Sequence, residues 1–546
     1  MTIEDKKKIV DIFLDNGFLL NPDLLNQDIS FFKNNINIID MEDKPLVLDQ
    51  NLLLSLGKIK QNINWREFER AKVLVEKGKD STIYKTFYNI LEYGLEEGKK
   101  QGVEKIVENI EEDSLGVSEI LEEEKETENN IILLKMYKDD YKKREIQDFV
   151  IYYNKRFEAL KKILLGRPEL QNVTSINRIL TKTNREEVSV IGMVSDKNET
   201  KNGNILISLE DTTGIIKVLI SKNRSELFTS GKNIVFDEMI GITGVSGGQI
   251  IFANNIIFPE VPINNHLKKS PDEVYAAFIS DIHVGSKKFL EDEFIKFINW
   301  LNGNFGDDDQ KNIAKKVKYL FMVGDLVDGV SVYPGQENEL LIKDLVKQYE
   351  KFAELIGMIR GDIKMIICGG QHDAIRMSEP QPPLMRKYTE AVYKIPNAIL
   401  VSNPCLVNIQ STKDFEGFNI YMYHGASFHY YVDNVESLRN AKENPSNTMK
   451  FLLQKRHFAP THSSNVFVPE TEEDPLVIEK VPDVVVCGDS HRSAIGNHNG
   501  VIIINCSCWQ SKTDFQEKVG HDPDPAKVPI LNLKTREIKI LKFGDE

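Results

Sequence analysis

Apolar runs alternate with helical segments along the C-terminal half of the chain. From about residue 272 onward the apolar runs are VYAAFIS, KYLFMVG, IKMIICG, FNIYMYHG, DVVVCGD and GVIIINCS. Runs that are apolar at nearly every position are typical of strands buried on both faces of a sheet, with helices as the covering layers. The pattern therefore predicts an α/β sandwich over residues 263–546.

A different pattern, of short β-rich runs separated by turn signals, occupies residues 186–260. The runs VSVIGMV, ILISLED, IIKVLIS and IVFDEMIGITGVS are separated by segments such as TTG, and GG precedes QIIFANNIIF. Five or six short strands in this span predict a small closed barrel. An oligonucleotide-binding (OB) barrel over residues 169–262 fits the size and strand count. Few exposed aromatic residues are available for base stacking, so a packing role is an equal alternative.

The N-terminal part of the chain has a helical pattern interrupted by an acidic stretch. The segments KKKIVDIFLDNGFLL and WREFERAKVLVEK predict a helical N-terminal module over residues 1–75, which we interpret as a docking module. Residues 104–128 contain eleven acidic residues and two lysines, so residues 76–134 are predicted to be an acidic linker. A helical lead segment is predicted over residues 135–168, ended by Gly166 and Pro168.

The charge and composition of the chain exclude several classes of protein. The 546 residues include 69 basic and 83 acidic side chains, a net charge of −14, so bulk charge is not expected to hold nucleic acid. No run of about 18 apolar residues is present, which argues against a membrane-spanning helix. The N-terminus lacks the features of a signal peptide. The five cysteines do not suit a secreted disulfide scaffold, so a cytoplasmic protein is expected.

Histidine and cysteine are confined to the second half of the chain. All ten histidines lie between His266 and His521, and the first 265 residues contain neither residue type. Metal or acid–base chemistry is therefore expected in the C-terminal half.

Polar clusters follow five of the predicted strands in that half. They occur in FISDIHVGS, MVGDLVDG, ICGGQHDAIR, MYHGAS and VCGDSHRS, and they contain Asp281, His283, Asp325, Asp328, Gln371, His372, Asp373, His424, Asp489 and His491. Active sites of open α/β sheets gather beyond the carboxyl ends of the strands. One such cluster alone is more often a capping aspartate with a surface histidine, but five in order predict one shared site.

The residue types in these clusters suit a pair of divalent metal ions. Aspartate, histidine and an amide oxygen together are ligands for Mn²⁺, Fe²⁺ or Zn²⁺. Two such ions about 3.5–4 Å apart can hold the attacking and leaving oxygens of a phosphoryl group. The sequence therefore predicts phosphoryl-transfer chemistry at this site.

At these residues the chain resembles the calcineurin-like metallophosphoesterase superfamily, whose motifs are D-x-H, G-D-x-x-D, G-N-H-D, a lone His and G-H-x-H. A narrower resemblance, over about residues 145–546, is to the small exonuclease subunits of archaeal D-family DNA polymerases. It is carried by YPGQ at 333–336, RHFAPTH at 456–462, the tail WQSKTDFQEKVGHDPDPAKVP, and DFVIYYNKRFEALKKILLGRPEL ahead of the barrel. The resemblance implies a four-layer α/β-sandwich metallophosphoesterase domain preceded by an OB-like barrel.

The resemblance also implies roles for individual residues. The first metal would be bound by Asp281, His283 and His491, with Asp325 bridging to the second. The second metal would use Gln371, His424 and Asp489. His372 would act beside the scissile phosphate and Asp373 would orient it, whereas Asp328 would support the loop.

Two residues of the second metal site depart from the superfamily motifs. Gln371 stands where asparagine is usual, and Asp489 stands where histidine is usual. The departures either shift the second ion and favour Mn²⁺, with Mg²⁺ possible, or weaken its binding and the activity.

Basic residues near the clusters are candidate contacts for the DNA backbone, with ordinary surface charge as the alternative for each one. Arg376 is the preferred candidate because it follows the His372–Asp373 turn. The other candidates are Lys287, Lys288, Arg492 and Lys512.

The leading hypothesis from the resemblance is a metal-dependent 3′–5′ exonuclease that proofreads DNA 3′ ends. Its partner would be the large catalytic subunit of the D-family polymerase, in a heterodimer or heterotetramer. One alternative is a catalytically weak or inactive assembly subunit of the polymerase. A weaker alternative is a stand-alone phosphoesterase acting on a small substrate.

Overall fold

The structure is a computed structural model that describes residues 131–544, apart from gaps at 139–141, 183, 264–266, 514–515, 518–519 and 521. It also describes a parallel pairing of two dipeptide strands, β1 (Leu19–Leu20) and β2 (Val47–Leu48). The chain divides into two units, of which the second comprises Glu126–Asp140 and Arg144–Glu546. The predicted N-terminal module, apart from these strands, and the acidic linker up to residue 130 lie outside the described residues.

The first of two six-stranded sheets has the order β12-β11-β10-β9-β18-β19. Its central strands β9, β10, β11 and β12 are parallel, and β18 and β19 add antiparallel neighbours. The bounds are β9 Tyr275–Ile279, β10 Val317–Val323, β11 Lys364–Cys368, β12 Ala398–Leu400, β18 Lys527–Asn532 and β19 Ile538–Lys542. β9 and β11 are buried or nearly so at every position, as the apolar runs predicted.

The second sheet has the order β16-β17-β15-β14-β13-β3. Its strands are β13 Cys405–Ile409, β14 Phe418–Met422, β15 Val484–Cys487, β16 Ala494–His498, β17 Val501–Asn505 and β3 Ile131–Met136. β3 corrects two predicted boundaries, because residues 131–134 were assigned to the linker and 135–136 to a helix. The run IILLKM instead pairs antiparallel with β13, and Ile131 is buried against that sheet.

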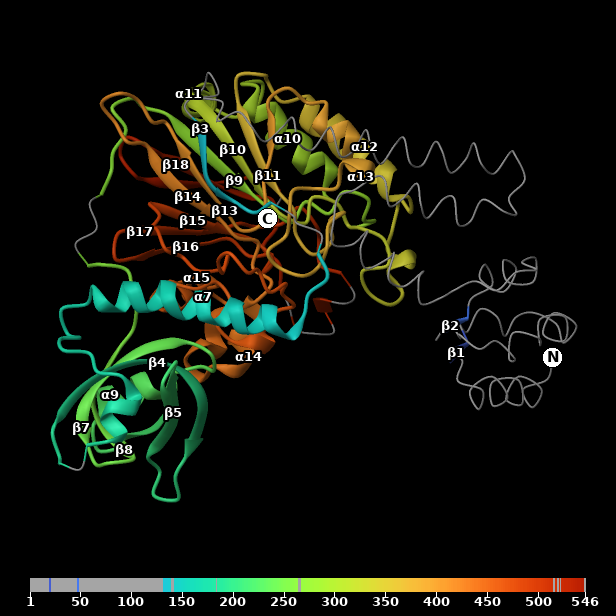
Figure 1. The fold of residues 1–546 in the computed structure, drawn as a ribbon. Helices are drawn as coiled ribbons and strands as arrows, with labels where there is room; N and C mark the ends of the chain where they lie inside the picture. The colour runs from blue at the N-terminus through green and yellow to red at the C-terminus, as the bar shows by residue number, and fades with distance from the viewer. Residues whose placement is uncertain are drawn as a thin grey trace, which may run out of the picture. The chain divides into compact units, whose positions relative to one another are not determined.

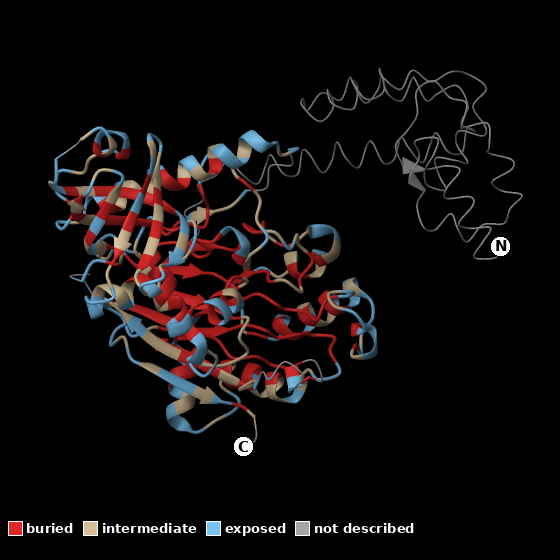
Figure 2. Cartoon of the chain, turned by 90° about the horizontal axis from the view of Figure 1, so that it is seen from below, coloured by how far each residue is buried: buried red, intermediate tan, exposed pale blue. Residues whose placement is uncertain are grey.

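The two sheets face each other through one apolar core, and helices cover the outer face of each sheet (Figures 1 and 2). The intervening core joins β9, β10 and β11 to β13, β14, β15 and β17. The outer face of the first sheet packs on α10 (Glu291–Leu301), α11 (Asp308–Lys316) and α12 (Leu345–Gly357). The outer face of the second packs on α14 (Phe428–Asn434) and α15 (Ser446–Lys455). One short helix, α13, spans Arg386–Tyr393, and 3₁₀ segments lie at Gln336–Asn338, Glu436–Lys442 and His462–Ser464.

The predicted closed barrel is present and has five strands in the order β4-β5-β6-β8-β7. β7 pairs with β4 to close it, and β6 and β8 are parallel. Its elements are α8 Ile176–Leu180, β4 Glu187–Glu199, β5 Ile205–Asp211, β6 Gly214–Ile220, α9 Ser225–Lys232, β7 Met239–Ser246 and β8 Ile250–Ile257. The alternation of buried and partly exposed residues along β5 and β6 fills the interior with branched apolar side chains.

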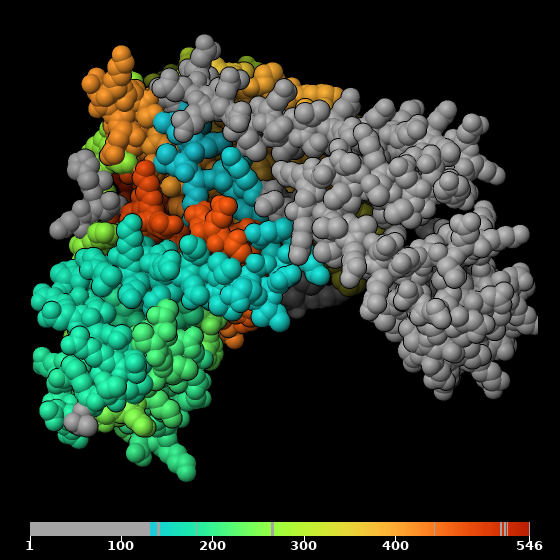
Figure 3. Space-filling model, in the orientation of Figure 1, coloured from blue at the N-terminus to red at the C-terminus, as the bar shows by residue number. Residues whose placement is uncertain are grey.

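Helix α7 (Ile146–Leu165) lies along the boundary between the barrel and the sheets (Figures 1 and 3). It ends before Gly166, as predicted, but begins at Ile146 and not at 135, because the preceding residues include the strand β3. Its apolar side packs on β4, β7 and β8. Arg156 on α7 forms a buried ion pair with Asp474, with Nε 2.7 Å from Oδ2. A second buried ion pair, Lys455 Nζ to Glu238 Oε2 at 2.7 Å, connects α15 to the barrel.

None of the helices in the described part of the chain is long and apolar enough to cross a membrane. All five cysteines are buried and free of disulfide bonds.

Candidate metal centre

The polar clusters that follow the strands of the two sheets converge at one place. Asp281 follows β9 and Asp325 follows β10 in the first sheet, whereas His424 follows β14 and His491 follows β15 in the second. Because these strands are parallel to their neighbours, their carboxyl ends share one edge of each sheet. The sequence prediction of a single site formed by distant strand ends agrees with this geometry.

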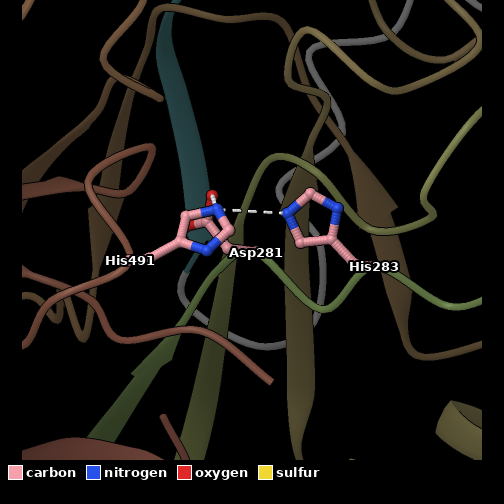
Figure 4. Close-up of side chains that lie close together, drawn as sticks. All are labelled: Asp281, His283 and His491. Carbon is pink, nitrogen blue, oxygen red and sulfur yellow. Dashed lines mark hydrogen bonds and ion pairs between the residues drawn. The ribbon is translucent and has the colours of Figure 1, made fainter. Parts of the chain in front are cut away.

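One group of candidate ligands consists of Asp281, His283 and His491 (Figure 4). His491 Nε2 lies 3.4 Å from Asp281 Oδ1, and His283 Nε2 lies 3.2 Å from His491 Nε2. Their facing atoms all lie within 4.8 Å of one another. Two imidazole nitrogens and a carboxylate oxygen directed at one point are a suitable donor set for a divalent transition metal.

Asp325 belongs to two further groups of potential ligands, one with Asp281 and His424 and one with His283 and His372. Its Oδ2 atom lies 3.3 Å from His424 Nε2, 3.9 Å from His372 Nε2 and 4.0 Å from His283 Nε2. This position between two ligand groups is the one that a bridging carboxylate requires.

The buried polar atoms of His424 fit a metal ligand. Its Nδ1 lies 2.8 Å from the carbonyl oxygen of Val323, which needs a donor, so Nε2 is the nitrogen left to bind. That Nε2 atom is buried and has no hydrogen-bond partner among the described residues. A Cβ on Gly370 would lie 2.7 Å from it, so glycine is required beside this ring. The Asp325 carboxylate, 3.3 Å away, is its charged neighbour, so a cation placed between the two groups would be bound by both.

The charges at the site stabilise one another. Burial opposes ionisation of Asp325, but His424, His372 and His283 hold its pKa well below the usual range. Burial also opposes protonation of His424, but Asp325 raises its pKa well above the usual range. The pKa of His491 is raised in the same way, against its burial, by Cys508 and Asp281. A metal ion binding here would displace protons from these histidines, as metal binding commonly does.

The backbone at the candidate ligands adopts left-handed conformations. Residues Asp281, His283, Asp325, Asp489 and His491 have φ between 50° and 65°. Non-glycine residues rarely adopt this region, and such strain gathers at functional sites where the surroundings enforce it. The left-handed backbone conformation at five ligand positions indicates that the loops are shaped to present these side chains.

The structure corrects the interactions expected for His372 and Asp373. Asp373 does not contact the His372 ring, because its oxygens accept hydrogen bonds from the backbone of Gly370 and Leu326 and from the hydroxyl of Tyr349. His372 Nδ1 instead lies 2.7 Å from the carbonyl oxygen of Asp328. Asp373 therefore ties the loop to α12, and the neighbouring strand's loop orients His372.

Three glutamines that the sequence did not mark as functional hold the candidate ligands in place. Asp328 Oδ1 lies 3.1 Å from His283 Nδ1, and Gln336 and Gln510 both donate to the Asp328 carboxylate. Gln516 lies 3.0 Å from His491 Nδ1. Gln336 lies in YPGQ and the other two lie in the C-terminal tail, so the segments that carried the resemblance orient the candidate ligands.

Of the two residues that depart from the superfamily motifs, Asp489 reaches the cluster of candidate ligands and Gln371 does not. Asp489 Oδ1 lies 4.0 Å from His424 Nε2, so this carboxylate reaches the second group. Its other oxygen contacts His429, a residue that the sequence reasoning missed. The half-buried Gln371 side chain makes no hydrogen bond or ion pair within the described residues. Gln371 is thus the one predicted ligand that these contacts do not connect to the cluster.

The basic side chains proposed to contact DNA differ in how far the protein itself already engages them. The Arg376 guanidinium donates to the carbonyl oxygens of Ser378 and Pro380 and stacks over Tyr137, so the structure uses it to hold a loop. Lys287 donates to the Asn338 carbonyl. Arg492 lines a cavity of about 320 Å³ together with Asp489 and His429. Arg492 directly follows the predicted ligand His491, and its Nη1 donates to the Asp522 carbonyl oxygen at 3.4 Å.

The amino-acid sequence of this chain is similar to subunits of known DNA polymerases. The family model for the B subunits of DNA polymerases alpha and epsilon matches residues 276–495, a range that contains both sheets' ligand loops. The chain is similar, at 40% identity over 404 residues, to the DNA polymerase II small subunit of Methanothermobacter thermautotrophicus, covering 74% of this chain and 81% of that protein.

Two further relatives agree. The DNA polymerase II small subunit of Archaeoglobus fulgidus is 37% identical over 424 residues, covering 77% of this chain and 83% of that protein. That of Pyrococcus furiosus is 38% identical over 402 residues, covering 73% of this chain and 64% of that protein. The chain therefore belongs to the family of small subunits of archaeal D-family DNA polymerase, also called DNA polymerase II.

Proposed function

We propose that this chain is a metal-dependent 3′–5′ exonuclease that removes nucleotides from DNA 3′ ends during proofreading. The observation that carries the proposal is the position of the Asp325 carboxylate, which is shared by ligand groups from both sheets. An inactive scaffold has no need for five ligand positions held in left-handed backbone conformations, because such strain reduces stability.

The proposed ligand set assigns a role to each side chain. Asp281, His283 and His491 would hold the first ion, Asp325 would bridge, and His424, Asp489 and Gln371 would serve the second. Bound there, two divalent ions would polarise the phosphodiester and activate a water molecule for in-line attack. Mn²⁺ is the preferred ion, with Mg²⁺ as a substitute, because three carboxylates are hard oxygen donors.

His372 is the proposed acid that protonates the leaving 3′ oxygen. Its Nδ1 is anchored on the Asp328 carbonyl, so Nε2 is directed toward Asp325. Its side chain is 20% exposed, the most accessible of the histidines that contact Asp325. Burial opposes its protonation, but Asp325 and Asp328 raise its pKa above the usual range, a direction that suits a proton donor.

The surrounding domains support a role in a polymerase complex. We propose that the sandwich is of the calcineurin-like metallophosphoesterase type and that the barrel is an OB barrel, because its strand order, its parallel β6–β8 pair and the helix α9 between β6 and β7 follow that topology. The large catalytic subunit would dock on the barrel and sandwich and would provide most of the grip on DNA. A partner with that role explains how a chain of net charge −14 works on nucleic acid.

A catalytically weak assembly subunit is the second candidate. The observation that favours it is Gln371, whose side chain is not joined to the cluster, together with a carboxylate at position 489 where histidine is usual.

One experiment separates the two candidates. The chain, alone and with its large subunit, is incubated with a 3′-mismatched primer and Mn²⁺, and shortening is compared among wild type, Asp325→Asn and His372→Ala. We expect both substitutions to slow shortening by about 100–1,000-fold, the size of effect seen when a group that stabilises a transition state is lost. Lys162→Ala, an exposed change on α7, is the control. Absence of metal-dependent shortening by the wild-type complex would establish the assembly role instead.

A further inference from the structure

His429 lies beside the carboxylate that replaces a histidine in the second ligand group. It occurs in α14, five residues after His424, and its Nε2 lies 3.3 Å from Asp489 Oδ2. The other oxygen of the same carboxylate, Oδ1, lies 4.0 Å from His424 Nε2. Asp489 therefore stands between two imidazoles, one fully buried and one with a side chain that is 50% exposed.

The substitution of aspartate for histidine at this position creates a physical problem that His429 can solve. A histidine ligand would bring one neutral nitrogen, whereas Asp489 brings two oxygens and a negative charge to a site that already contains Asp281 and Asp325. A third carboxylate in a buried site repels the others unless a positive or donating group faces it. His429 faces the Asp489 oxygen that points away from His424.

The backbone at Asp489 is held in place by its neighbours, so only the rotation of the Asp489 side chain remains to be determined. The Asp489 amide donates to both oxygens of Asp281, at 3.2 and 3.1 Å, and a Cβ on Gly425 would lie 3.1 Å from the Asp489 Cβ. The loop is thus fixed on two sides. What decides which oxygen reaches His424 is the rotation of the carboxylate. Asp489 Oδ2 makes no hydrogen bond among the described residues and lies 3.3 Å from His429 Nε2, so the ion pair with His429 is the contact that can set this rotation.

We propose that His429 is a positioning residue for the second metal ion, and that the His429–Asp489 pair replaces the single histidine usual at position 489. Asp489 Oδ1 would bind the ion beside His424, while His429 holds Oδ2. The inference rests on the proposed two-metal site. It assigns to this chain a metal-site residue that lies outside the superfamily motifs.

The test is a double-mutant cycle read by Mn²⁺ binding to the full-length protein, without DNA, using calorimetry and the electron paramagnetic resonance signal of free Mn²⁺. The four proteins are wild type, His429→Ala, Asp489→His and His429→Ala/Asp489→His. We expect His429→Ala to weaken the second Mn²⁺ by about 10-fold or more, as for other groups that orient a ligand, with the first unchanged. In the Asp489→His background the same change should have no effect, since no carboxylate remains to orient.

A matched control is His498→Ala, which removes the imidazole from another histidine–carboxylate pair, with Glu260, outside the metal centre. It should leave both Mn²⁺ affinities unchanged. The inference is overturned if wild type binds fewer than two Mn²⁺, or if His429→Ala weakens binding equally in both backgrounds or not at all. Primer shortening is assayed separately, so a protein that shows the expected cycle without shortening DNA would contradict only the exonuclease proposal.

Discussion

The Asp474 and Asp325 carboxylates are both buried against histidine, and their surroundings differ. Asp474 accepts from Arg156, from the hydroxyl of Tyr152 and from the Leu476 amide, and it also contacts His457 Nε2 at 2.8 Å. The other ring nitrogen of His457 accepts from the Ala459 amide. At Asp325 the facing nitrogen of His424 lies 3.3 Å from the carboxylate, farther than the His457 nitrogen lies from Asp474, and makes no hydrogen bond among the described residues.

The difference shows two uses of the same side-chain types. Around Asp474 every polar group is paired, and the cluster joins α7 to the loop after α15, so it holds the parts of this unit together. Around Asp325 the donors converge on a common point and the backbone is strained at five positions. Polar groups that are fully hydrogen-bonded stabilise a fold, whereas charged groups that converge on one point without complete hydrogen bonding are suited to bind a ligand.

The largest expected effect is on stability, through Arg156→Ala. Because Asp474 would remain buried without its guanidinium partner, the free energy of unfolding should fall by about 3–5 kcal/mol, measured by urea denaturation. Asp325→Asn should cost less, because the histidines around Asp325 can release their protons whereas arginine cannot. Lys318→Ala, which removes an exposed ion pair with Asp362, is the control and should cost less than about 1 kcal/mol. Equal losses for Arg156→Ala and Asp325→Asn would erase the contrast between the clusters.

The next effect is a loss of stability in acid that originates at His457. Burial, and then Arg156, lower its pKa from 6.5 to about 4. A depressed folded-state pKa contributes stability that is fully present above 6.5 and is lost as the pH falls through 4, worth about 3 kcal/mol at most. His457→Gln should flatten the dependence of unfolding free energy on pH in this window. An unchanged slope in that variant would place the acid sensitivity elsewhere.

The metal centre should show the opposite dependence on pH. Asp325 raises the pKa of His424, so its contribution is fully present below about 6.5 and is lost as the pH rises through the raised pKa. The melting temperature of metal-free protein should therefore fall as the pH rises through this raised pKa. Mn²⁺ at 100 times its dissociation constant should raise the free energy of unfolding by about 2.7 kcal/mol. This increase should be absent in Asp325→Asn. Equal stabilisation of that variant by Mn²⁺ would locate the ion outside this centre.

The smallest expected effect is on DNA affinity, through Arg492→Ala. If Arg492 contacts one phosphate, the slope of log affinity against log salt for the polymerase complex should decrease by about 1. Arg376→Ala should leave the slope unchanged, since the Arg376 side chain binds backbone carbonyls. A change in slope for Arg376→Ala and none for Arg492→Ala would reverse the ranking of these two candidates.

Local patterns in the sequence determined the strands and the types of residue at the site. Uniformly apolar runs such as VYAAFIS form buried strands wherever helices can cover them, and a polar cluster directly after such a run must lie at a sheet edge. Alternation and turn signals likewise predicted a closed barrel, whose five strands the structure confirms. These features depend on neighbours within a few residues, so one sequence is sufficient to read them.

Only the tertiary structure decided which distant groups meet. The strand β3, from a segment that reads as linker and helix, is stabilised by pairing with β13, some 270 residues later, and no local pattern records that partner. Asp373 bonds to Tyr349 and not to His372, and His429 reaches Asp489, because loops from different strands set these contacts. Arg376 looked available for DNA in the sequence, yet nearby carbonyls and Tyr137 engage it. Contacts between residues far apart in the chain depend on packing in three dimensions, which residue order alone does not specify.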